Sequence, residues 1–112
     1  MYILVVYVPE THLEVVKEAL FEAGAGQIGD YRRCSWQVRG MGQFEPGEGS
    51  SPFIGDLGRL EELPEYRVEI ACPDQKLKSI AAALVEAHPY EEPAYHFYRG
   101  LSLLELPGGD SG

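Results

Sequence analysis

An internal repeat constrains the fold of this chain more than any other feature. Residues 2–23 align with residues 66–87 at an offset of 64 positions. Each copy contains an apolar run, then a proline, then apolar residues at helical spacing, and Pro9 aligns with Pro73. Such an order indicates a strand, a turn and a helix. The repeat therefore predicts two strand–turn–helix units in one chain.

Start and end signals mark the two predicted helices, at about residues 12–23 and 75–87. Thr11 followed by Glu14 fits the S/T-x-x-E capping box of the first helix. Asp74 is expected to cap the second helix. Glycines end the first helix and a proline ends the second: Gly24, Gly26 and Pro89.

A strand candidate follows each helix, at about residues 28–39 and 94–99, and the second leaves a continuation to Leu106 open. Two split βαβ units that share one antiparallel sheet give an α+β fold, the ferredoxin-like βαββαβ sandwich. Right-handed crossovers place both helices on one face. We expect a single domain over residues 1–106 and a disordered tail over 107–112.

The sheet face opposite the helices bears on assembly. If the even positions of the first strand face the helices, its odd positions point away: Ile3, Val5 and Tyr7. The last strand offers aromatic side chains to both faces: Tyr95, Phe97 and Tyr98. A strand that is apolar on both faces needs cover on both, so we expect a second chain to bury Ile3, Val5, Tyr7, and Tyr95 or Tyr98. Arg67 and Glu69 would share this face and leave a monomer as the alternative.

Charge and hydropathy exclude several classes of partner. With a formal net charge of −9, the chain would be repelled by nucleic acid and by anionic lipid. No apolar run approaches the ~18 residues that span a bilayer, and the N-terminus predicts a strand rather than a signal peptide. We expect a cytoplasmic protein in which Cys34 and Cys72 are reduced core thiols. A metal pair and a disulfide are the alternatives for these cysteines.

A long connection separates the two units. Residues 40–64 contain six glycines and three prolines, and also apolar side chains that favour burial: Phe44, Phe53, Ile54, Leu57 and Leu60. We expect a loop without a long helix that packs on the sheet or on a neighbouring subunit and contacts a protein partner. Its candidate binding residues are Phe44, Glu48 and Phe53. The segment matches no phosphate-binding glycine motif and is strongly acidic, which argues against nucleotide binding.

The sequence HPYEEP at residues 88–93 supports two interpretations. In the structural one, His88 meets unpaired carbonyls at the helix end, Pro89 stops the helix and Tyr90 packs its ring. In the functional one, His88 and Glu91, with Glu92 as a further ligand, bind a divalent metal such as copper or zinc. An acid/base role would also need a substrate pocket and an orienting group.

Two motifs together resemble a known family. GQFEPGEGSSPFIG at residues 42–55 and HPYEEPAY at residues 88–95 are similar to the domain inserted in Nif-three-like dimetal proteins, which also occurs free-standing. HPYEEP before a final strand also resembles the CutA divalent-ion tolerance proteins. The resemblance covers residues 2–106. It implies a CutA/PII-like domain that assembles as a homo-trimer with the sheets packed inward.

The resemblance also bears on activity. In PII proteins the connection between strands two and three contacts effectors and partners, and CutA proteins are associated with divalent copper. This chain departs from the Nif-three-like loop at Glu45, where that family often carries a basic residue. The dimetal site of that family lies in flanking domains. With only three histidines here, the resemblance does not carry the dimetal hydrolase activity over to this chain.

We therefore expect a non-enzymatic module that binds a small effector, a divalent metal or a protein. Its candidate binding residues combine the two motifs: Phe44, Glu48, Phe53, His88, Tyr90, Glu91 and Glu92. The alternative is a small enzyme with a pocket between subunits that uses His88, Tyr90 and Glu91.

Overall fold

The computed structural model describes residues 1–109, and residues 110–112 of the predicted tail lie outside this range. Six main elements follow in chain order: β1 (Tyr2–Pro9), α1 (Leu13–Glu22), β2 (Trp36–Phe44), β3 (Glu61–Cys72), α2 (Leu77–Ala87) and β4 (Tyr95–Arg99). The strands form one sheet in the order β2-β3-β1-β4, and all neighbours are antiparallel. The predicted ferredoxin-like βαββαβ fold is confirmed.

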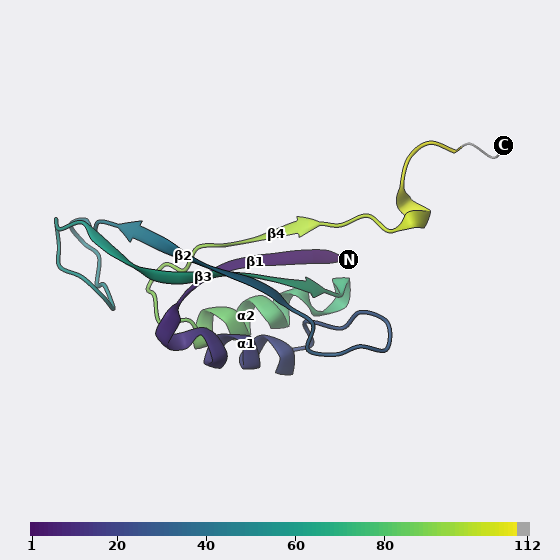
Figure 1. The fold of residues 1–112 in the computed structure, drawn as a ribbon, viewed down its shortest axis with the longest axis horizontal. Helices are drawn as coiled ribbons and strands as arrows, with labels where there is room; N and C mark the ends of the chain where they lie inside the picture. Colours follow the sequence, from purple (N-terminus) through teal and green to yellow (C-terminus); the bar gives the residue numbers. More distant parts are fainter. Residues whose placement is uncertain (110–112) are drawn as a thin grey trace.

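Both helices cover the same face of the sheet, as predicted (Figure 1). Alternate residues of β1 are fully buried against them: Leu4, Val6 and Val8. The helices and β3 complete this core with Leu13, Val16, Leu20, Val68, Ile70, Cys72, Ile80 and Leu84. Tyr95 and Phe97 of β4 pack against the same core. The repeat therefore reflects two strand–helix units that share one apolar layer.

The predicted helix caps are wrong, although the helix ends are right. Thr11 Oγ1 lies 2.8 Å from His12 Nδ1, and Asp74 pairs with the N-terminal amino group, so neither caps a helix. Each helix instead begins after a short 3-10 turn, at Glu10–His12 and at Asp74–Lys76. At the other ends, Gly24 adopts a left-handed φ of 110° and α2 stops at Ala87, one residue before the His88–Pro89 pair.

The second strand lies later in the chain than predicted. Residues 28–35 form a loop with an isolated bridge between Ile28 and Tyr31, and β2 continues to Phe44. Cys34 is therefore a half-buried loop residue, which corrects its assignment to the core. Cys72 is a buried core residue, and burial raises the pKa of its thiol to about 11. Both thiols are free.

The long connection is shorter than predicted, because both flanking strands extend into it. It covers residues 45–60, and none of these residues is helical. β3 tolerates Pro64 because β1 pairs only with Glu65–Cys72, so the missing N–H of Pro64 faces no β1 partner. The hairpin of β2 and β3 thus projects beyond the rest of the sheet, and Figure 1 shows the loop at its tip.

The sheet face away from the helices is partly apolar and uncovered. The pairing register places Val5 between Glu69 of β3 and His96 of β4 on this face. Exposed apolar side chains of two strands, β2 and β4, share the face: Trp36 (58%), Val38 (46%) and Tyr98 (55%). Tyr95 packs toward the helices and is therefore excluded from the predicted contact between chains.

The C-terminal segment after β4 does not continue the strand. Residues 100–109 extend away from the body of the domain, with one 3-10 turn at Leu103–Glu105 (Figure 1). Among residues 1–109, no helix has the length and apolar character that crossing a membrane requires.

Candidate functional site

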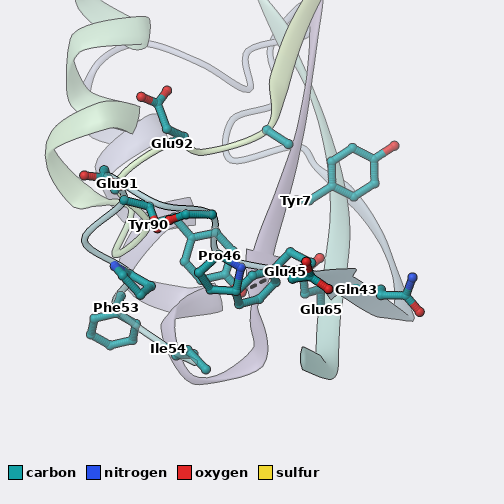
Figure 2. A pocket seen from close by; sticks show the side chains of 15 residues that line it. Tyr7, Gln43, Glu45, Pro46, Phe53, Ile54, Glu65, Tyr90, Glu91 and Glu92 are labelled. Carbon is teal, nitrogen blue, oxygen red and sulfur yellow. Dashed lines mark hydrogen bonds between the residues drawn. The ribbon is translucent and has the colours of Figure 1, made fainter. Parts of the chain in front are cut away.

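A cavity of about 440 Å³ lies where the loop after β2 meets the segment that follows α2 (Figure 2). β1 and β3 contribute Tyr7 and Glu65 to its walls. The β2 end and its loop contribute Gln43, Phe44, Glu45, Pro46, Gly47, Ser50, Pro52, Phe53 and Ile54. The segment after α2 contributes Tyr90, Glu91, Glu92 and Ala94. Both sequence motifs therefore contribute to the walls of one cavity.

Tyr90 joins these walls to the sheet. Its hydroxyl donates a hydrogen bond to Glu65 Oε2 at 2.7 Å, and its ring lies 5.9 Å from the ring of Phe44. Burial, followed by the hydrogen bond and the charge of Glu65, raises the pKa of Tyr90 above its usual value. The phenol therefore remains a donor, and it holds one oxygen of the Glu65 carboxylate in place.

His88 supports the cavity from behind and does not line it. Its side chain is buried, Nε2 lies 2.7 Å from the carbonyl oxygen of Tyr7, and the Tyr90 N–H donates to Nδ1 at 3.1 Å. A carbonyl only accepts and an N–H only donates, so the proton is on Nε2. Burial lowers the pKa of His88, which favours this neutral form. The backbone N–H of His88 donates to the Leu84 carbonyl of α2 at 2.8 Å, whereas its side chain binds the Tyr7 carbonyl of β1.

The predicted metal ligands take part in separate hydrogen bonds. Both ring nitrogens of His88 have partners, and Glu91 Oε1 accepts a hydrogen bond from the Ser51 N–H at 3.0 Å. No group of three or more His, Cys, Asp or Glu side chains within residues 1–109 is arranged to hold a metal ion. A metal at His88 would have to displace one of its two bonds. The copper or zinc site therefore stays a prediction, and its test is given below.

The loop over residues 45–60 is ordered around Pro46. Pro46 is buried, and its carbonyl accepts a hydrogen bond from the Gly58 N–H at 2.7 Å. The ring of Phe53 meets that of His12 edge-on at 5.4 Å. Three apolar side chains of the loop remain more than half exposed within the single chain: Phe53, Leu57 and Leu60. Their predicted packing on a neighbouring subunit stays a prediction.

A glycine makes room for the Glu65 side chain beside β2. A Cβ atom at Gly42 would collide with the Glu65 carboxyl group, whereas a Cβ at Gly40 would meet nothing within 4 Å. Glu65 pairs with Gly40 across the strands, so its side chain lies over the bare backbone of β2. The carboxylate position thus depends on Gly42.

The cavity is acidic. Four carboxylates line it, two from the β2–β3 side and two from the segment after α2: Glu45, Glu65, Glu91 and Glu92 (Figure 2). Among its described lining residues, none is Lys, Arg or His. Ser50 is a hydroxyl in the wall, and it donates to the Gly47 carbonyl at 2.7 Å.

Five of the seven predicted binding residues come together in this cavity: Phe44, Phe53, Tyr90, Glu91 and Glu92. His88 lies behind Tyr90, and Glu48 is exposed and does not line the cavity. The prediction missed several wall residues: Tyr7, Gln43, Glu45, Pro46, Ile54 and Glu65. Membership of the motif GQFEPGEGSSPFIG could have indicated four of these six. Nothing in the local sequence marks Glu65 or Tyr7.

The fold and the cavity define a class of protein. The fold, a four-stranded antiparallel sheet with two helices on one face, is similar to that of CutA proteins. The PII-like protein CutA from Nostoc superposes with a TM-score of 0.63 and 15% identity, over 89% of this chain and 81% of its own. Identity at this level shows the fold alone.

Similarity in sequence identifies relatives more specifically than similarity in fold. The GTP cyclohydrolase 1 type 2 homolog of Mycobacterium leprae is 47% identical over 108 residues, which are 96% of this chain and 27% of the relative. A Bacillus cereus protein related to NIF3 has a TM-score of 0.74 and 43% identity, over 87% of this chain and 24% of its own. The chain therefore spans about a quarter of the relatives that it matches. No protein-family model matches it. This chain has the fold of CutA proteins and is similar in sequence to a segment of NIF3-related proteins, so the predicted resemblance is confirmed.

Proposed function

We propose that the chain is a non-enzymatic binding module whose ligand occupies the cavity between the loop 45–60 and the HPYEEP segment. One observation carries this proposal: the 440 Å³ cavity has aromatic and apolar walls with a few polar groups. Its volume lies in the range of small-molecule sites, roughly 300–1,000 Å³. Both sequence motifs contribute to its walls, so a ligand here would contact the two most distinctive parts of the chain.

The alternative of a small enzyme has less support. The predicted enzyme would use His88 in its chemistry, but this side chain is buried outside the cavity and both of its ring nitrogens are hydrogen-bonded. The Ser50 hydroxyl donates to a carbonyl, and no histidine is among the described lining residues to activate it. The Mycobacterium leprae relative is named as a homolog of a GTP cyclohydrolase. A triphosphate does not fit this cavity, because its four carboxylates would repel the phosphate charges.

We further propose that the module assembles as a homo-trimer through its uncovered sheet face. The exposed Trp36, Val38 and Tyr98 support a contact there. The loop 45–60 also carries exposed apolar side chains, Leu57 and Leu60, which a protein partner could cover.

A cavity-filling variant tests the binding module. Small amphiphilic molecules are titrated into the protein while the backbone amide signals are followed by NMR. We expect shifts at residues 43–47 and 90–94. Ile54→Trp should suppress them because the indole occupies the cavity, and the matched control Leu57→Trp should not, because Leu57 does not line it. Shifts that persist in Ile54→Trp would contradict the proposal.

A further inference from the structure

We propose that the cavity binds a small organic cation, a guanidinium or ammonium group on an apolar body, and that Glu65 pairs with the cationic group. This inference rests on the proposed function and specifies the ligand of the same cavity. It follows from the charge of the walls, the position of Glu65 and the aromatic side chains around it.

The wall carboxylates lack cationic partners. Among residues 1–109, no salt bridge includes Glu45, Glu65, Glu91 or Glu92. Five of the six arginines pair elsewhere, in Arg33–Glu18, Arg39–Glu10, Arg59–Asp56, Arg67–Glu69 and Arg99–Glu105. Four like charges around one cavity repel each other, and a cation between them lowers this electrostatic energy. An anion would raise it.

Glu65 is the carboxylate that the fold positions most firmly. Gly42 leaves space for its carboxyl group, and the Tyr90 hydroxyl binds its Oε2 atom. No hydrogen bond within the described residues uses its Oε1 atom. A carboxylate with one oxygen fixed and the other free presents a preset acceptor to an N–H donor. Glu91 is also held by one oxygen, because its Oε1 accepts a hydrogen bond from the Ser51 N–H, but its side chain is exposed whereas that of Glu65 is half-buried.

The remaining walls suit the apolar body and the flat face of such a ligand. Phe44, Pro46 and Ile54 supply apolar surface, and Tyr7 and Tyr90 add aromatic rings. Aromatic faces attract guanidinium and ammonium groups. The structure contains an example beside the cavity, where the Arg67 guanidinium lies 5.9 Å from the Tyr7 ring centre and donates to the Tyr7 hydroxyl at 3.3 Å.

The shape favours a free small molecule over a peptide. A cavity of 440 Å³ has room for a compact ligand, while a peptide that presents an arginine needs further surface for its backbone. The probes are therefore butylguanidinium, its neutral analogue butylurea and the anion pentanoate, with the blocked peptide acetyl-Gly-Arg-Gly-amide as the comparison. Affinity is measured by NMR titration of the amide signals of residues 43–47 and 90–94.

Two substitutions separate a specific ion pair from a general effect of charge. Glu65→Gln removes the charge but keeps an oxygen that can accept the Tyr90 bond. Glu62→Gln removes the same charge from the same strand, at an exposed side chain that does not line the cavity. We expect Glu65→Gln to lower the affinity for butylguanidinium by about tenfold or more, the usual effect of losing a charge-assisted hydrogen bond. Glu62→Gln should change this affinity by less than about twofold.

Each outcome decides between the two proposals. Weaker binding of butylurea and pentanoate than of butylguanidinium supports the cation. Equal affinity for butylurea, equal effects of Glu65→Gln and Glu62→Gln, or binding of the peptide alone would overturn it. If butylurea binds as tightly as butylguanidinium, the cation proposal is wrong but the proposed binding module is still supported. If no probe of any charge shifts the cavity signals, both the cation and the proposed function are wrong.

Discussion

Tyr90 and Glu65, separated by 25 positions in the sequence, meet in a 2.7 Å hydrogen bond. This bond attaches the segment after α2 to β3, at the place where the hairpin of β2 and β3 leaves the rest of the sheet. His88 adds a second attachment through the Tyr7 carbonyl of β1. The HPYEEP segment is thus attached to two strands, and these two hydrogen bonds position its side of the cavity.

Tyr90→Phe tests the first attachment. The variant keeps the ring that packs near Phe44 and removes only the hydroxyl that serves Glu65. We expect the free energy of unfolding to fall by about 1 kcal/mol, the usual net value of one such hydrogen bond. Urea denaturation measures it. Tyr31→Phe, at a ring that is 75% exposed, is the control and should change little. Equal losses in both variants would show that the bond does not stabilise the fold.

The general fold could be predicted because its signals are local and repeated. The aligned apolar runs of β1 and β3 and the helical stripes that follow them are visible in single windows of sequence. The boundaries of β2 could not be predicted from the sequence, because glycines such as Gly40 and Gly42 are typical of loops. Their place in a strand depends on pairing with β3, and Gly42 in particular depends on the side chain of Glu65.

The candidate site was predicted only in part for the same reason. The motif residues Phe44, Tyr90 and Glu91 carry recognisable sequence signals, and they do line the cavity. Glu65 lies in β3, which also contains Glu61 and Glu62, so the sequence does not distinguish Glu65 from these other acidic residues. His88 was a predicted metal ligand because imidazole is a common ligand, and the sequence does not show that this side chain is buried. Burial and two hydrogen bonds make it a supporting residue.

His88 predicts how stability depends on pH. Burial lowers its pKa in the folded chain below the unfolded value of about 6.5, against the opposing effects of the Tyr7 carbonyl and the nearby Glu65. The unfolded state then binds more protons, so the contribution of neutral His88 is fully present above about pH 6.5 and is lost as the pH falls below it. Protonation of His88 would also put a hydrogen on Nδ1, which would then face the Tyr90 N–H and could no longer accept its hydrogen bond.

Urea denaturation between about pH 7.5 and pH 5.5 measures this loss. We expect His88→Gln to be less stable than the wild type at the higher pH and to lose less stability on acidification. His96→Gln, at an exposed side chain, is the control and should keep the slope of the wild type. An unchanged slope in His88→Gln would assign the pH dependence to other groups.

Metal addition tests the copper or zinc hypothesis. Because both His88 nitrogens already have partners, we expect one equivalent of copper or zinc to leave the melting temperature of the wild type unchanged relative to chelator. His88→Ala should melt at a lower temperature under both conditions. An increase with metal that disappears in His88→Ala and shrinks in Glu91→Gln would instead establish the predicted site.

Val38→Glu tests the proposed trimer. Val38 is 46% exposed on the uncovered sheet face, so a carboxylate there should leave the single chain folded but place an unpaired charge in the contact between chains. Val5 is a poorer choice because it is only 3% exposed within one chain. Sedimentation should show a trimer for the wild type and monomers for Val38→Glu. Val15→Glu, on the exposed side of α1, should remain trimeric. A monomeric wild type would refute the assembly.

Gly42→Ala tests how the cavity carboxylate is positioned. Neither Gly40 nor Gly42 has a positive φ, so alanine fits the backbone at both positions. At Gly42 the new methyl group must push the Glu65 side chain aside and break its bond to Tyr90, which should cost about 1 kcal/mol of unfolding free energy. Gly40→Ala meets nothing and should be neutral or slightly stabilising. Since Gly42→Ala and Tyr90→Phe remove the same bond, the double variant should lose less stability than the two single losses added together. Full additivity in urea denaturation would show that Glu65 keeps its partner and that Gly42 does not control the carboxylate.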